Sequence, residues 1–319
     1  MPFADKRSPL RGIALKVAAV TVFIAMASCI KATAPSVPPG EAVFFRSFFA
    51  MPVIVAWLMF RHDWPGGLRT GNPWGHVWRG LVGVSAMMMG FAALGLLPLP
   101  QVTAIGYAVP VFTVILAALF LGERIRAFRI TAVLLGLVGV AIVLWPELMA
   151  SGVEASEARA LGALLALGSA VGASVAQVLV RRLVEKEDTP AIVFYFSLSA
   201  SVIGLLSLPA GSLGLARDWV VPSGWEAALL VAAGVLGGLG QIALTAAYRY
   251  ADASTIAPFE YVSIVLAIAI GYAAFGEVPT AWTLAGVAVV IAAGILIIWR
   301  ESRLGLRRGK GRRLVTPQG

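Results

Sequence analysis

The sequence places a carboxylate and an arginine inside apolar segments, where neither has an obvious partner. Glu260 lies in STIAPFEYVSIVLAIAIGYAAF and is the only charged residue between Asp252 and Glu277. Arg46 lies within the apolar run 41–60. A charge at membrane depth costs about 2.5–3.5 kcal/mol on insertion scales, so such residues usually face a partner or a ligand. We expect Glu260 to bind a proton or a cationic ligand group, and Arg46 to bind an anionic one.

Both charges also have a structural interpretation. Glu260 can be a static, hydrogen-bonded carboxyl that stays protonated, because burial favours the neutral form. Arg46 can form a fixed ion pair or bond to helix-end carbonyls. Lys16 has a long stem that can carry its charge to the membrane surface. Four further charges lie near predicted segment ends, where we expect solvated caps: Lys31, Glu123, Arg181 and Glu277.

Uncharged polar residues within the apolar segments are the other candidates for ligand contact. A tyrosine ring stacks on a planar ligand while its hydroxyl donates a hydrogen bond, and a glutamine amide bonds polar groups. Pro258 lacks a backbone N–H, so it loosens the preceding turn and leaves a carbonyl exposed. In a helix bundle such side chains also commonly bond a neighbouring helix. Besides Pro258, these candidates are Tyr107, Gln177, Gln241, Tyr248 and Tyr261.

Composition places these residues in a membrane. The chain has 319 residues, of which 59% are hydrophobic and 13% charged, and its mean hydropathy is +0.88. Apolar stretches of about 20 residues, the length of a membrane-crossing helix, recur along it. The sequence therefore predicts an all-α membrane protein with ten transmembrane helices, at residues 11–30, 41–60, 77–97, 101–121, 128–146, 160–181, 190–209, 225–248, 254–275 and 280–299.

The distribution of Lys and Arg predicts the orientation. Of the 25 positive residues, 20 fall in the tails and alternate loops on one side, only Lys31, Arg159 and Arg217 fall on the other, and Lys16 and Arg46 lie within segments. Because positive residues are retained in the cytoplasm, both termini should be cytoplasmic, in a cell inner membrane. The alternative for the first segment, a cleaved signal peptide, is disfavoured by its length.

Matching landmarks predict an internal repeat. Glu123 follows a glycine and precedes Trp145 by 22 residues, and Glu277 follows a glycine and precedes Trp299 by the same spacing. Five segments per repeat is an odd number, so the second repeat crosses in the opposite sense. Helical transporters commonly use this arrangement, with the substrate site between the halves. The predicted divisions are two inverted five-helix repeats, 11–147 and 160–302, and a basic cytoplasmic tail, 303–319.

Several functions are disfavoured. No basic stripe with interleaved aromatics indicates nucleic acid, despite a net charge of +9. One cysteine and two histidines exclude a disulfide framework or a Cys/His metal cluster within one chain, and we expect no cofactor. No Walker-type loop indicates ATP hydrolysis. The glycine-rich runs GVLGGLGQ and LLGLVGVA follow no strand, and close helix packing explains them better than phosphate binding.

Two stretches resemble a known family. PLPQVTAIGYAVPVFTVILAALFLGE with RITAVLLGLVGVAIVLWP, and AYRYADASTIAPFEYVSIVLAIAIGYAAFGE with GVAVVIAAGILIIWRE, are similar to the two halves of EamA family proteins of the drug/metabolite transporter superfamily. The resemblance covers residues 11–302. It implies ten helices in two inverted repeats and transport of amino acids, vitamins, other metabolites or drugs. The sequence APFEY in the second half is similar to that of a branch of the family that includes riboflavin and S-adenosylmethionine carriers. Relatives often carry an acidic residue near the position of Ala27, and this sequence has none there.

The sequence therefore predicts a secondary transporter of a small organic metabolite, such as an amino acid, a vitamin or a nucleoside-like compound. It would work by alternating access, with protons as a candidate coupling ion and the lipid bilayer and a small-molecule substrate as partners. A lipid-carrier translocase of the same fold is the nearer alternative. A membrane-embedded enzyme is the other, although no Ser/His/Asp set, metal cluster or paired carboxylates can be assembled from these segments.

Overall fold

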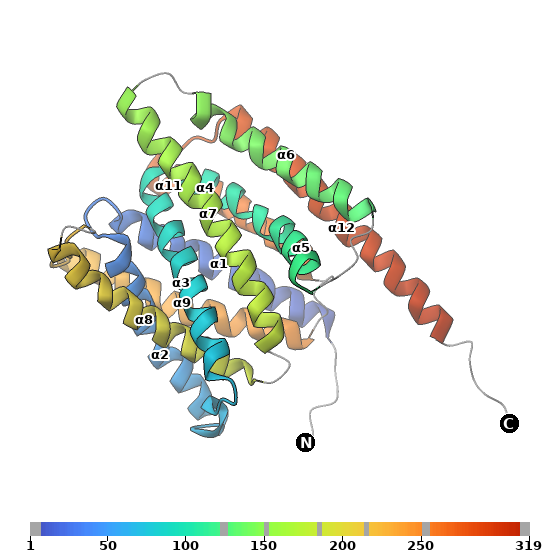
Figure 1. Cartoon of the computed structure of the whole chain (residues 1–319), viewed down its shortest axis with the longest axis horizontal. Coiled ribbons are helices and arrows are strands. Elements are labelled where there is room, and N and C mark those ends of the chain that lie inside the picture. Colours follow the sequence, from blue (N-terminus) through green and yellow to red (C-terminus); the bar gives the residue numbers. More distant parts are fainter. Residues whose placement is uncertain are drawn as a thin grey trace.

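The computed structural model describes residues 8–121, 127–149, 153–183, 187–213, 217–250 and 256–312, and every regular element within them is helical (Figure 1). The predicted all-α class is therefore confirmed. The elements are α1 (Pro9–Thr33), α2 (Pro39–Phe60), η1 (Gly66–Leu68), α3 (Pro73–Leu96), α4 (Leu99–Gly106), α5 (Ala108–Leu121), α6 (Ala127–Met149), α7 (Val153–Leu183), α8 (Thr189–Ser212), α9 (Gly224–Tyr250), η2 (Ala257–Tyr261), α11 (Val262–Phe275) and α12 (Ala281–Arg312).

Ten helical segments occupy the ten predicted positions, if α4 is counted with α5 and η2 with α11. Among the described residues, six helices are long and apolar enough to cross a membrane, namely α1, α2, α3, α7, α8 and α9. Shorter apolar helical stretches lie in α6, η2–α11 and α12. These helices make the chain a multi-pass membrane protein.

Proline and glycine set several helix boundaries. Pro9, Pro39 and Pro73 begin α1, α2 and α3, where a missing N–H costs nothing because the first turn has no helical acceptor. Asn72 caps α3, with its Oδ1 accepting a hydrogen bond from the Gly75 N–H at 3.0 Å. Gly276 ends α11 in the left-handed region, with φ of 66°, which glycine adopts without strain.

Two of the ten segments depart from a regular α-helix near their beginning among the described residues, and we call them the broken segments. The prediction of one continuous helix over 101–121 was wrong, because α4 ends at Gly106 and α5 begins at Ala108. Pro110 has no N–H to donate to the Gly106 carbonyl, so a regular helix cannot continue through this turn. The segment before α11 is the 3₁₀ turn η2, which contains Pro258 in its first turn. Most of the turn before Pro258, which was expected to be loosened, lies outside the described residues.

The helices pack as several pairs of long neighbours. Helix α1 packs against α9, α3 against α7, α2 against α8 and α9, and α6 against α12. Figure 1 shows α6 and α12 side by side along one edge, with α2 and α8 at the opposite side. One apolar core, which includes Val43, Val84 and Leu230, lies among α1, α2, α3, α8 and α9. A second, which includes Ile105 and Ile264, joins α4–α7 with α11 and α12.

The glycine-rich runs pack helices closely, as predicted. A Cβ on Gly286 of α12 would lie 2.5 Å from the carbonyl oxygen of Gly139 in LLGLVGVA. A Cβ on Gly238 of GVLGGLGQ would lie 2.9 Å from Cβ of Val53 in α2. In lipid, the hydrophobic effect does not drive helices together, so their association depends on close packing. Small residues allow the helix backbones to approach closely enough for this packing.

Two boundaries differ from the prediction. Helix α7 begins at Val153 rather than 160, and α12 runs to Arg312, past the predicted end of the second repeat at 302. The residues that follow Trp299 include Glu301, Arg303 and Leu304, all good helix formers, and no proline interrupts them. The first part of the predicted basic tail is therefore helical.

Candidate functional site

The two broken segments meet through a chain of polar contacts. Tyr107 follows α4 directly, and its hydroxyl lies 2.6 Å from Oγ of Ser263 in α11. Ser263 donates to the carbonyl oxygen of Glu260 at 2.7 Å, so Tyr107 is the donor to Ser263. The ring of Tyr261 contacts the Tyr107 ring edge-on, with centroids 5.2 Å apart. The structure thus brings together three predicted site residues, Tyr107, Glu260 and Tyr261.

Glu260 forms an ion pair with Lys16 of α1, 244 residues away in the chain. The Lys16 side chain is only 6% exposed, whereas that of Glu260 is 48% exposed. Two expectations need correction. Lys16 does not extend to the surface, because its ammonium is held by this carboxylate. Glu260 is not an isolated, desolvated acid, because a cation neutralises it and half of its side chain remains exposed.

A second ion pair joins α1 to the far end of α11. Lys31 Nζ lies 2.8 Å from Oε1 of Glu277 and also donates to the carbonyl oxygens of Leu94 and Leu97 at 3.1 and 2.8 Å. The other oxygen of Glu277 accepts from the Leu99 N–H at 2.8 Å. Both charged side chains are mostly buried, so the expectation of solvated caps at Lys31 and Glu277 was wrong. Lys31 and Glu277 are far apart in the sequence, and no local sequence pattern predicted that they would pair.

Arg46 lies on α2 with 4% of its surface exposed. Its Nε is buried and has no hydrogen-bond partner in the part of the chain that the structure describes. Neither a fixed ion pair nor carbonyl bonding, the two structural interpretations, is found there. Arg79 is a residue that the sequence reasoning missed. It lies two residues inside the predicted segment 77–97 and was counted with the positive residues of the preceding loop, whereas α3 begins at Pro73 and includes it well inside the helix.

The remaining candidates are more dispersed. Gln177 on α7 accepts a long hydrogen bond from Thr113 Oγ1 of α5 at 3.4 Å, which fits its interpretation as a helix-to-helix contact. Gln241 is half-buried on α9, and no polar contact of it is found among the described residues. The side chains of Tyr248 and Pro258 lie outside the described part of the structure. No contact of Gln177 or Gln241 with Tyr107 or Tyr261 is found among the described residues.

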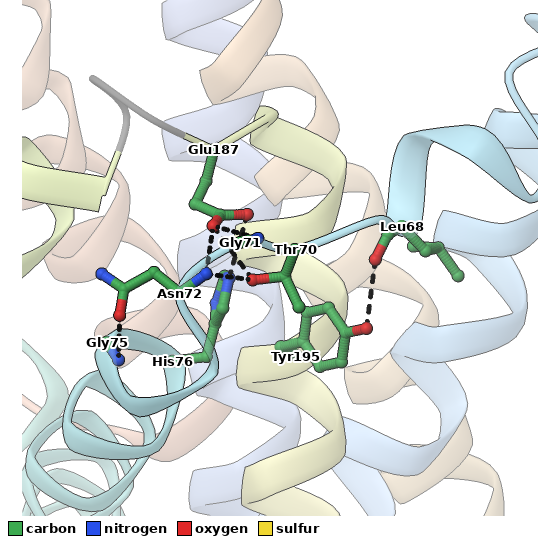
Figure 2. Close-up of polar contacts among 8 residues, drawn as sticks. All are labelled: Leu68, Thr70, Gly71, Asn72, Gly75, His76, Glu187 and Tyr195. Atoms are coloured by element: carbon green, nitrogen blue, oxygen red, sulfur yellow. Dashed lines mark hydrogen bonds and ion pairs between the residues drawn. The ribbon is translucent and has the colours of Figure 1, made fainter.

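A separate polar cluster lies between two loops (Figure 2). Oε1 of Glu187, just before α8, accepts hydrogen bonds from Thr70 Oγ1 at 3.0 Å and from the backbone N–H groups of Gly71 and Asn72 at 2.9 and 2.8 Å. His76 Nε2 lies 3.5 Å from the other oxygen, Oε2. The cluster ties the α2–α3 loop to the start of α8.

Opposing effects act on the Glu187 carboxylate. Burial raises its pKa, but the hydrogen bonds from Thr70, Gly71 and Asn72 and the contact with His76 outweigh this, so the pKa of Glu187 is below its usual value. Its ionised form is therefore part of the folded structure, because accepting several donors favours the charged state. Nothing in the sequence pattern indicated that Glu187 and His76 would meet.

Ten apolar helical segments, two of them broken and joined by buried polar contacts, are the features of a helical membrane transporter. The sequence model of the EamA-like transporter family matches residues 10–145 and 160–299. The chain therefore belongs to this family, and its relatives are transporters of the drug/metabolite type.

The chain is also similar to individual transporters. It is 31% identical to the S-adenosylmethionine uptake transporter of Rickettsia felis, over 84% of this chain and 85% of that protein. It is 32% identical to the pseudopaline exporter CntI of Pseudomonas aeruginosa, over 90% and 95%, and 30% identical to the riboflavin transporter of Rhizobium johnstonii, over 83% of each. A solved crystal structure that is 22% identical shares the fold, with a TM-score of 0.65 over 93% of this chain and 99% of that one.

Glu187→Gln should destabilise the protein near neutral pH and have less effect in acid. The pKa of Glu187 is lower in the folded state than its unfolded value of about 4.3, so its contribution is fully present above that pH and is lost as the pH falls through the folded pKa. Melting temperatures of the purified wild type and variant, measured from pH 7 down to about 3.5, should converge.

The matched control is Glu157→Gln, which changes an exposed glutamate on α7 and should shift the melting temperature little at any pH. A difference between wild type and Glu187→Gln that stays constant across this range would contradict the assigned role of the carboxylate.

Proposed function

We propose that the protein is an inner-membrane secondary transporter of a small organic metabolite that works by alternating access. The observation that carries the proposal is the contact between the two broken segments, α4–α5 and η2–α11, in the interior of the bundle. Discontinuous helices of this kind form the substrate and ion sites of many secondary transporters. The relatives that carry S-adenosylmethionine, pseudopaline or riboflavin support a small organic molecule as the substrate class.

We infer further that residues 11–147 and 160–302 are inverted repeats. Shifting Gly122-Glu123 onto Gly276-Glu277 also shifts Tyr107 onto Tyr261, so the two helix breaks fall at equivalent places. A two-fold relation would exchange α1 with α7 and α3 with α9. The contact of α1 with α9 then requires the contact of α3 with α7, and both exist. The pairs α2–α8 and α6–α12 map onto themselves and also exist.

In this account the Lys31–Glu277 pair closes one end of the transport path. It joins α1 and the ends of α3 and α4 in the first half to α11 in the second. A solute that passes between the halves at this end must separate these elements. Both charges are buried, so opening this end must give them water or other partners. This cost keeps the end closed until bound solute or ions favour the open state.

We assign ion coupling to Glu260. Its carboxylate is neutralised by Lys16, and a proton or a cationic ligand group that binds Glu260 would release this contact between α1 and η2. Pro258 and Tyr261 shape the turn that carries it. Arg46, Tyr107, Gln177, Gln241 and Tyr248 complete the proposed substrate contacts, with Arg46 binding an anionic part of the solute.

Reporter fusions test the proposed orientation. A fluorescent protein fused to the C-terminus should be active, and alkaline phosphatase at the same point should be inactive, because the positive residues place both termini in the cytoplasm. Alkaline phosphatase inserted at Pro222, in the segment before α9, should be active. The reverse pattern at either position would reject the orientation.

Transport by reconstituted protein tests the function. Metabolite profiles of a strain lacking the gene and of its parent identify the solute, and proteoliposomes then measure its transport with and without an imposed pH gradient. Glu260→Gln mimics the protonated acid, so it should fold and exchange solute but lose gradient-driven uptake. Asp63→Asn is the control, since Asp63 forms an exposed ion pair with Arg61 outside the bundle.

Normal gradient-driven transport by Glu260→Gln would reject proton coupling at this residue. Wild-type protein that moves no solute altered in the deletion strain would reject the proposed function itself.

A further inference from the structure

Two arginines inside the bundle have no anionic partner in the described part of the chain. The ion pairs found there involve Lys16, Lys31, Arg61 and His76, but neither Arg46 nor Arg79. Nε of Arg46 is buried without a hydrogen bond, and so are Nε and Nη1 of Arg79. The contact found for the Arg79 guanidinium is the face of the Phe196 ring, 4.0 Å from its centroid.

The two side chains extend toward each other. Arg46 is about 10 Å from the start of α2, and its guanidinium reaches Gly237 of α9, where a Cβ would lie 2.9 Å from Nε. The neighbouring Gly238 packs against Val53, so Arg46 points toward the C-terminal end of α2. Arg79 points toward the C-terminal end of α3, since a Cβ on Gly83 would lie 2.0 Å from its Nη1.

Helices α2 and α3 are consecutive candidate membrane spans and are in contact, so they run antiparallel, and the two guanidinium groups approach each other near half the length of each helix. The positive charge of Arg46 accordingly acts on Arg79. Gly237 and Gly83 leave the room that the two groups occupy. An unpaired charge is unfavourable at this depth, and mutual repulsion adds to the cost.

An anion between the two groups removes this cost. Guanidinium is planar, always charged and presents a fork of donors that matches a carboxylate, whereas a lone ammonium offers only a point charge. We propose that Arg46 and Arg79 together bind a carboxylate group of the solute, and thus that the substrate is a small organic carboxylate. This inference rests on the proposed function and adds to it a substrate class and a second binding residue, Arg79.

Thermal stability of the purified full-length protein tests the anion site without knowledge of the solute. The probes are succinate, inorganic phosphate and the neutral succinamide, at constant ionic strength set with sodium chloride. Succinate should raise the melting temperature of the wild type, and succinamide should not. Arg46→Met and Arg79→Met should raise the half-saturating succinate concentration at least 10-fold. Arg61→Met, which changes an arginine at the exposed end of α2, should leave it unchanged.

The same variants separate binding from a structural role. Without any anion, Arg46→Met should melt at or above the wild-type temperature, because it removes an unpaired buried charge. Arg46→Lys keeps the charge but loses the fork, so it should fold and bind succinate more weakly. An unresponsive wild type, a response to phosphate alone, or equal responses of the wild type and both Met variants would overturn the carboxylate site.

Proteoliposomes distinguish this inference from the proposed function. Transport of the identified solute that is unaffected by Arg46→Lys and Arg79→Lys would reject the carboxylate site and leave the transporter. Succinate binding that depends on both arginines, in a protein that transports nothing, would keep the site and reject the transporter.

Discussion

The contact between the two broken helices is the constraint on which the rest of the structure depends. Backbone groups freed by a helix break have no water to bond in a bilayer, so a break survives only where protein covers it. Here Tyr107, at the first break, donates to Ser263, and Ser263 donates to the Glu260 carbonyl in η2. The Glu260 carbonyl is thus bonded by Ser263, which is bonded in turn by Tyr107, and these bonds fix the place where the two segments meet.

The charges inside the bundle fall into two groups with different consequences. Lys16 with Glu260, and Lys31 with Glu277, are paired and join α1 to the segment η2–α11 at its two ends. Helix α1 is therefore tied to both ends of this segment. Arg46 and Arg79, on α2 and α3, have no anionic partner among the residues that the structure describes. Paired charges suit contacts that open and close, whereas unpaired ones suit a ligand that brings the missing charge.

The sequence predicted the class of fold because its signals are local. Apolar segments of spanning length, prolines at helix starts and small residues at close contacts are each set by neighbouring residues, and the structure has them. The break at Tyr107 was missed even though Pro110 marks it, because the apolar run continues through it. Pro258 was singled out because a charge and an aromatic residue beside it drew attention to the turn.

The candidate site was predicted only in part, because side-chain partners are set by packing between distant segments. Glu260 and Arg46 stood out as charges in apolar runs, but their surroundings could not be read from the sequence. Lys16 and Glu277 each acquired a partner that lies more than 200 residues away in the chain. Arg79 was overlooked because it lies only two residues inside the predicted segment 77–97 and was counted with the loop before it, whereas α3 begins at Pro73.

Locking the closed end tests the account most directly. A Cβ on Gly271 of α11 would lie 3.1 Å from Cδ of Pro100 in α4, next to the Lys31–Glu277 pair. A disulfide between Pro100→Cys and Gly271→Cys, in a Cys29→Ala background, should therefore join the two halves at this end. The account predicts that proteoliposomes lose solute transport when the disulfide forms and regain it on reduction, while oxidant leaves the Cys29→Ala parent unaffected. Full transport with the disulfide intact would contradict alternating access through this end.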